Sequence, residues 1–159
     1  MIEIKVCPGN LTPGFDNYSP ACLRQLFDGK KVSPILDFNY DADKDNFSTV
    51  INQISVSGVQ EKLSAIIRDN KIMLTPKGEQ GRYIIKPSPG YKHLRFRNQI
   101  PANEHLTMQI ARQVYKIKTA ENGLIFFADG EMAYITKRFD FSEDGTKIKQ
   151  EDFSSLAHK

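Results

Sequence analysis

The sequence contains only two cysteines, Cys7 and Cys22. Secreted domains stabilised by disulfides normally carry more, and two cysteines without clustered histidines make a poor zinc site. We therefore expect both residues to be reduced thiols that pack as small apolar groups. A local zinc or redox role for the pair is the alternative interpretation.

Long apolar runs and strong charge are also missing. No apolar stretch approaches the roughly 20 residues that a membrane helix needs, and Met1 leads directly into Ile2-Glu-Ile-Lys-Val6 without the pattern of a secretory leader. The formal net charge is only +3, whereas nucleic-acid binders usually show a denser basic stripe. These absences predict a cytoplasmic protein that binds neither membranes nor nucleic acid directly.

What is present is an ordinary globular composition. Hydrophobic residues make up 40% and charged residues 26% of 159 residues, which is enough for one hydrophobic core. One basic cluster, Lys92-His-Leu-Arg-Phe-Arg97, interrupts this composition. It is either a solvated loop or a loop that faces a phosphate group or a partner.

Turn and capping residues divide the first forty residues into short elements. Alternating polarity predicts a strand over residues 2–6. Ser19-Pro20 is typical of a helix start and Asp28-Gly29 of a helix end. Residues 35–38 are expected to form another small strand.

A regular sheet is predicted from residue 63 onward. Asp69-Asn70 is expected to form a tight hairpin turn, because both residue types tolerate positive φ. The periodicity of Leu106, Ile110, Ala111 and Val114 predicts a helix that packs these side chains against the sheet. The strands are expected at residues 63–68, 72–74, 83–86, 123–127 and 132–137, and the helix at residues 103–116.

This order predicts an α+β fold with one main helix packed on an antiparallel sheet, like the small lobe of a protein kinase. A short N-terminal α/β appendage is expected to precede it. We divide the chain into an N-terminal segment with one helix (residues 1–50), a nucleotide-binding lobe (51–141), and a linker with the start of a second lobe (142–159).

Lys86 and Glu104 are the residues of greatest chemical interest. Kinase-type folds hold ATP with a strand lysine that reaches the phosphates and a helix glutamate that fixes the lysine by an ion pair. Lys86 ends a short apolar run, and Glu104 begins the predicted helix. The alternatives are an ordinary lysine at a strand end and a glutamate that only favours the helix dipole.

Four motifs, in order, resemble one family. They are Ile54-Ser-Val-Ser-Gly-Val-Gln-Glu-Lys-Leu63, Ile85-Lys-Pro-Ser-Pro89, Asn103-Glu-His105 and Lys137-Arg-Phe-Asp140. Together they resemble the HipA-type toxin kinases. The short segment before the first motif resembles the HipT subgroup, which lacks an extra N-terminal subdomain.

The resemblance implies the N-terminal, ATP-binding lobe of a serine/threonine kinase from a toxin–antitoxin system, whose family target is an aminoacyl-tRNA synthetase. It implies that Lys86 contacts ATP phosphates and that Ser57, Gly58 and Val59 form the nucleotide loop. Ser55 and Ser57 align with autophosphorylated serines. It also implies a HipB-like helix-turn-helix antitoxin and a HipS-like small protein as partners.

The resemblance further places Arg138 and Phe139 at the hinge between two lobes, where the backbone hydrogen-bonds adenine. Lys137 departs from the family, which has glutamate there, so any role of that glutamate's side chain is not carried over. Glu104 completes the expected nucleotide site.

No residue after Phe139 supplies the carboxylates that phosphoryl transfer needs to position the hydroxyl and bind Mg²⁺. In the family these ligands lie in the C-terminal lobe. We therefore expect a truncated chain that is inactive alone. The alternative function is a non-catalytic interaction module that binds a HipB/HipS-like antitoxin or a transcriptional repressor.

Overall fold

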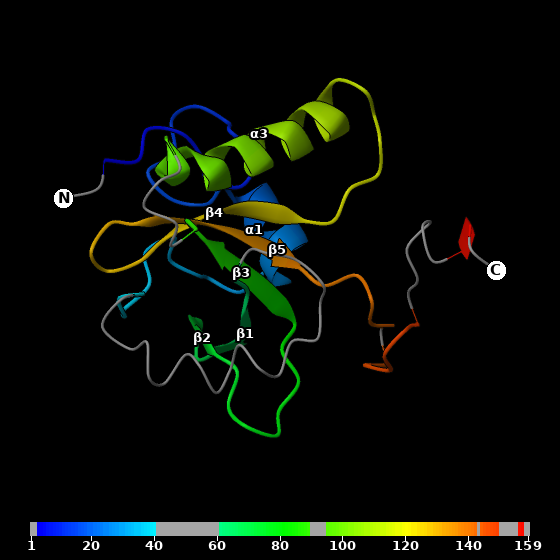
Figure 1. Ribbon diagram of the computed structural model, residues 1–159. Coiled ribbons are helices and arrows are strands. Elements are labelled where there is room, and N and C mark those ends of the chain that lie inside the picture. The colour runs from blue at the N-terminus through cyan, green and yellow to red at the C-terminus, as the bar shows by residue number, and fades with distance from the viewer. Residues whose placement is uncertain (1–2, 41–60, 90–94, 143, 150–155, 158–159) are drawn as a thin grey trace.

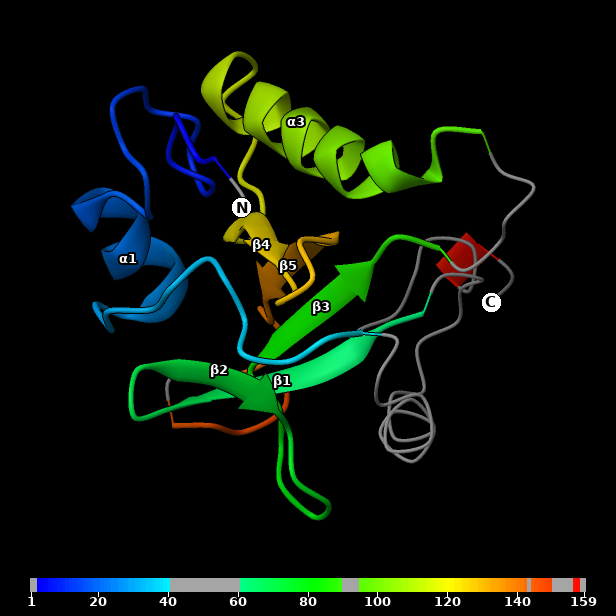
Figure 2. The same ribbon diagram turned by 90° about the vertical axis from the view of Figure 1, so that its left-hand side faces the viewer.

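The computed structural model describes residues 3–40, 61–89, 95–142, 144–149 and 156–157. Its centre is an antiparallel five-stranded sheet with strand order β2-β1-β3-β5-β4. One long helix, α3, lies across one side of the sheet, and a short helix, α1, lies on another side with the N-terminal segment (Figures 1 and 2). The predicted α+β fold is confirmed. The helices are α1 (Pro20–Phe27), η1 (Arg97–Gln99) and α3 (Ile100–Gln113), and the strands are β1 (Leu63–Arg68), β2 (Lys71–Leu74), β3 (Tyr83–Pro87), β4 (Asn122–Phe126) and β5 (Met132–Lys137).

The first hairpin and the first helix form where their sequence signals predict. Asp69 and Asn70 both have positive φ, 51° and 60°, in the two-residue turn between β1 and β2. The Ser19 side chain caps α1 by accepting from the Cys22 amide at 3.2 Å. Asp28 ends the helix in the left-handed region.

Two predicted N-terminal strands are wrong. Within residues 3–6, Val6 makes only an isolated bridge to Pro13, because the chain turns back through a tight loop in which the Leu11 amide donates to the Cys7 carbonyl. Ile35 likewise makes only one bridge, to Phe126. A short alternating run flanked by proline and glycine is compatible with a single bridge as well as with a strand, so this pattern did not predict which one forms.

The N-terminal segment and the sheet share one hydrophobic core. Its largest buried side chains include Leu26 and Phe27 from α1 and Ile85, Ile125 and Ile135 from the sheet. The segment approaches β4 closely: a Cβ on Gly123 would lie 3.2 Å from the Cα of Gly9. Cys7 and Cys22 are free and buried in this core, and the Cys7 sulfur also accepts a hydrogen bond from the Ser19 amide at 3.1 Å.

Helix α3 differs from its prediction in both position and orientation. It begins three residues early, with Pro101 in its first turn, and it ends before Lys116, which has positive φ. Leu106, Ile110 and Val114, expected to face the sheet, are exposed. The side chains buried against the sheet are instead Pro101, His105 and Gln109.

Candidate functional site

The alternation of β3 aims Lys86 at helix α3. Tyr83 and Ile85 are buried in the core shared with α1, so the side chains of Ile84 and Lys86 point to the opposite face. In the register of β3 with β5, Lys86 lies opposite Tyr134. The Lys86 ammonium is 5.3 Å from the centroid of the Tyr134 ring.

Glu104 meets this ammonium from the helix. Its Oε1 atom lies 2.5 Å from Lys86 Nζ, and the two side chains are 22% and 28% exposed. A carboxylate gains most from the helix dipole when it lies in the first turn of the helix. Because α3 begins at Ile100, Glu104 lies beyond that turn. The pairing of strand lysine and helix glutamate is therefore present in the structure.

A second lysine, Lys62, belongs to this site and was missed among the candidate residues. Burial and then the nearby charge of Lys86 lower the pKa of Lys62, while Glu104 opposes this effect. Lys62 is thus close enough to Lys86 and Glu104 for its pKa to respond to both charges. The signal was in the sequence, because Lys62 is the lysine of the serine- and glycine-containing motif at residues 54–63.

Tyr134 forms the apolar base of the site. Its side chain is 2% exposed, and burial, followed by the charge of Glu104, raises its pKa well above the ordinary tyrosine value. The ring is therefore neutral, and its face lies beneath the ammonium of Lys86. Only the register between β3 and β5 reveals this contact, and a single sequence does not specify that register.

Arg138 and Phe139 follow β5 and lie apart from the ion pair. The Arg138 amide donates to the Arg82 carbonyl at 2.9 Å, and its guanidinium binds both carboxylate oxygens of Asp140. Phe139 is 70% exposed. The Lys137 side chain turns toward α1 and pairs with Asp28 at 2.5 Å.

The structure does not describe the positions of the remaining residues predicted for the nucleotide site. Ser55, Ser57, Gly58 and Val59 lie outside the described residues. In the part of the chain that the structure describes, no group of three or more histidine, cysteine, aspartate or glutamate side chains is placed to hold a metal ion. No described helix has the length and apolar character to cross a bilayer.

Comparison with known proteins identifies the family. A family model described as the HipA-like C-terminal domain matches residues 54–159. The chain belongs to the HipA-like family. It is also 35% identical over 157 residues to a Haemophilus influenzae protein named "Putative kinase".

The alignment to this relative covers 94% of the HipA-like chain but 42% of the relative. The chain thus spans less than half of the relative's length. The family model begins at residue 54, which is the first residue of the first motif. All four motifs, with Lys86, Glu104, Arg138 and Phe139, therefore fall within the matched residues.

Proposed function

We propose that this chain is the ATP-binding lobe of a HipA/HipT-like serine/threonine kinase. The observation that carries the proposal is the partly buried Lys86–Glu104 ion pair, whose two charges also act on the pKa of Lys62. An ammonium has three donors, so Lys86, fixed by one contact to Glu104, keeps donors for phosphate oxygens. Family membership and the kinase relative support the same activity.

The distance between the two predicted parts of the site also suits a nucleotide. Tyr83, three residues before Lys86 on β3, pairs with Lys137 on β5. Arg138 and Phe139 therefore follow at a point about 10 Å along the strand from Lys86. A phosphate-binding amine and an exposed aromatic residue separated in this way match the phosphate and base ends of ATP.

In this proposal ATP and Mg²⁺ are the cofactors, with the magnesium ligands supplied by a C-terminal lobe. The complete kinase transfers phosphate to an aminoacyl-tRNA synthetase, works with HipB-like and HipS-like partners in a toxin–antitoxin system, and acts in the cytoplasm. Phosphorylation of Ser55 or Ser57 adds about two negative charges. These charges compete with ATP phosphates for the same cations and so inhibit the kinase.

Binding of a fluorescent ATP analogue tests the proposal. We expect Lys86→Ala to weaken binding at least about tenfold, because a charge-assisted contact to phosphate is lost. The matched control is Lys71→Ala, which removes an exposed strand lysine paired with Asp37 and should leave affinity unchanged. Equal binding by wild type and Lys86→Ala, with both folded by circular dichroism, contradicts the proposal.

A non-catalytic interaction module is the second candidate, favoured by the exposed apolar residues of α3. Such a module binds a HipB/HipS-like antitoxin or a repressor whether or not nucleotide is present. Co-purification with a HipB-like protein that is unaffected by ATP and by Lys86→Ala supports this candidate. Phosphate transfer by the chain alone contradicts both it and our expectation that the isolated lobe is inactive.

A further inference from the structure

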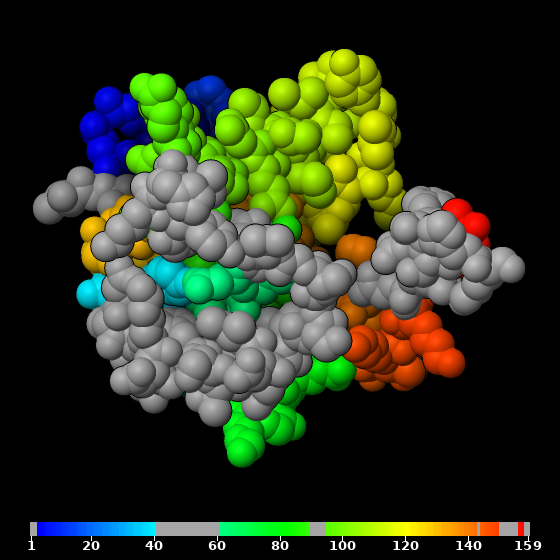
Figure 3. All heavy atoms as spheres, in the orientation of Figure 1, coloured from blue at the N-terminus to red at the C-terminus, as the bar shows by residue number. Residues whose placement is uncertain are grey.

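Helix α3 presents apolar side chains to solvent. Leu106, Ile110 and Val114 recur every four residues and therefore lie on one face of the helix, with exposures of 47%, 42% and 66%. Tyr115 and Ile117 follow at 70% and 57%, and the Ile117 amide bonds back to the Ala111 carbonyl in the last turn. We call these five residues the outer stripe. Helix α3 carries Leu106 and Ile110 and lies at the rim of the molecule, and the other three residues follow it in the chain (Figures 1 and 3).

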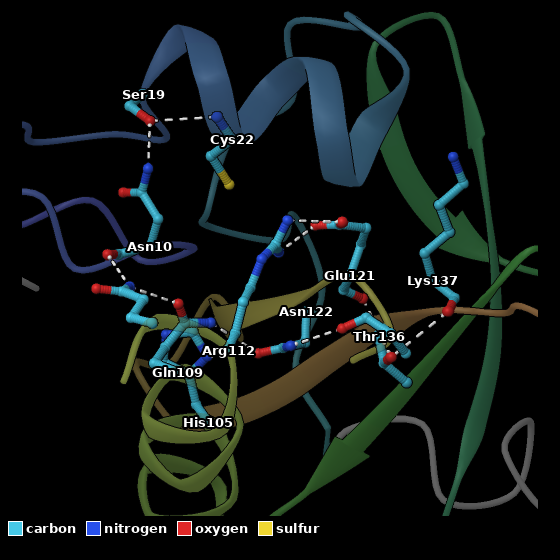
Figure 4. A network of polar contacts seen from close by, with 12 residues as sticks. Asn10, Ser19, Cys22, His105, Gln109, Arg112, Glu121, Asn122, Thr136 and Lys137 are labelled. Atoms are coloured by element: carbon cyan, nitrogen blue, oxygen red, sulfur yellow. Dashed lines mark hydrogen bonds and ion pairs between the residues drawn. The ribbon is translucent and has the colours of Figure 1, made fainter. Parts of the chain in front are cut away.

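The inner face of α3 explains why the stripe faces outward. His105 and Gln109 are buried and both approach the Asn122 side chain (Figure 4). The two charged residues of the helix, Glu104 and Arg112, pair with Lys86 and Glu121 on the sheet side. Both charged side chains between Ile100 and Gln113 thus form ion pairs on the sheet side of the helix. The outer face of the helix therefore carries no charged side chain.

Such a face is unusual for a helix in contact with water. A surface helix normally carries charged residues opposite its buried side. The outer stripe offers apolar surface on the order of 500 Å², which is the size of patch that is often functional on a monomer. The exposed residues of α3 are apolar or polar without charge, and an interface explains an exposed helix face that carries no charge.

Basic residues lie before α3 and alternate with the last residues of the stripe after it. Arg95 and Arg97 precede α3, and Lys116 and Lys118 follow it. Between residues 95 and 121 the only carboxylates are Glu104 and Glu121, and both are held in ion pairs. A complementary surface is therefore apolar in its middle and acidic at its ends.

We propose that the outer stripe docks a helical segment of another protein, with an aliphatic face flanked by acidic residues. A second copy of this chain fits poorly, because either a parallel or an antiparallel pairing of two α3 helices places basic ends against basic ends. The stripe is also smaller than the roughly 800 Å² that each partner buries in a stable complex of standard size. A short acidic helix fits both the charge and the area.

Fluorescence anisotropy with designed peptides tests this surface on the full 159-residue chain. The probe is a labelled amphipathic helix with leucines along one face and glutamates at both ends, and its counterpart carries lysines at the ends. We expect the acidic-ended peptide to bind and the basic-ended peptide not to bind. Ile110→Gln should weaken binding about tenfold, as expected for a central interface residue.

Charge reversal provides the sharper measurement. Lys116→Glu combined with Lys118→Glu should reduce affinity for the acidic-ended peptide and increase it for the basic-ended one. The matched control is Met73→Gln, which removes an exposed apolar residue from β2 and should change nothing. None of these residues belongs to the proposed nucleotide site, so ATP-analogue binding should persist in every variant.

Four outcomes overturn the proposal. They are failure of both peptides to bind, binding that survives Ile110→Gln, concentration-dependent dimers that Ile110→Gln abolishes, and binding to anionic phospholipid vesicles that Ile110→Gln abolishes. The third outcome assigns the stripe to a second copy of the chain, and the fourth assigns it to a membrane surface. Circular dichroism and a thermal melt confirm that each variant is folded.

Discussion

The two ends of α3 each join the sheet through an ion pair, but the pairs differ in kind. Near the start of the helix, Glu104 meets the flexible ammonium of Lys86 through one contact, with Lys62 nearby. Near its end, the Arg112 guanidinium binds both oxygens of Glu121, at 2.6 and 2.9 Å. The second pair is geometrically complete, whereas the first retains cationic donors.

The surroundings sharpen this difference. Beside Glu121, the Asn122 side chain accepts from Gln109, contacts His105 and donates to the Ala120 carbonyl (Figure 4). Among the described residues, Lys86 Nζ makes only the hydrogen bond to Glu104. We infer that the end of α3 near Asn122 holds the helix in place, while the end near Lys86 is available to a ligand.

Asn122→Ala should have the largest effect on stability. Asn122 is 2% exposed, and its loss leaves two buried side chains, His105 and Gln109, without their shared acceptor. We expect a loss of about 2–4 kcal/mol in the free energy of unfolding, measured by urea denaturation. Asn103→Ala, an exposed change on the same helix, should cost less than about 0.5 kcal/mol. Equal stabilities of the two variants would show that the Asn122 network does not hold the helix.

Arg112→Ala and Lys86→Ala should show that the two ends of α3 have different roles, one in stability and the other in ATP binding. Because the Arg112–Glu121 pair is about one-third exposed, Arg112→Ala should cost about 1 kcal/mol in unfolding free energy. Affinity for the ATP analogue should not change. Lys86→Ala should have the opposite profile, with a large loss of affinity and a small loss of stability. Urea denaturation and analogue titration of both variants check the comparison, and identical profiles would contradict it.

The sequence predicted the sheet well because its signals are local. Asp69-Asn70 marks one hairpin turn, and the limits of β5 follow from its alternating residues. The orientation of α3 was wrong because helical periodicity locates an apolar face without showing what that face contacts. Here polar side chains face the sheet, where His105 and Gln109 both hydrogen-bond to the Asn122 side chain. Lys86 and Glu104 were identified by type and spacing, but the contribution of Tyr134 depends on long-range strand register.

His105 should make the stability depend on pH. Burial lowers its pKa in the folded protein, although the hydrogen bond to Asn122 opposes this effect. The unfolded chain then binds a proton more readily, so stability is complete above the unfolded pKa of about 6.5 and falls as the pH drops below it. The slope from this one residue is at most about 1.4 kcal/mol per pH unit.

Urea denaturation at several pH values from 5 to 8 measures this slope. His105→Gln removes the titrating group while keeping an amide that can donate to Asn122. The variant should therefore lose less stability than wild type on acidification. Parallel curves for the two proteins would assign the acid sensitivity to other groups.

The smallest effect is expected at the contact between β5 and α1. Lys137, which replaces the glutamate expected from the HipA-type motif, pairs with Asp28 at 2.5 Å. Asp28 is 61% exposed, so the pair should contribute less than about 1 kcal/mol.

Lys137→Glu places two carboxylates together and should destabilise the fold slightly more than Lys137→Ala. Adding Asp28→Asn, which keeps a residue that tolerates the left-handed backbone of position 28, should remove the repulsion. High salt should diminish the difference between the variants, because it screens exposed charges. A loss in Lys137→Glu that neither salt nor Asp28→Asn relieves would show that residue 137 stabilises β5 through packing rather than through its charge.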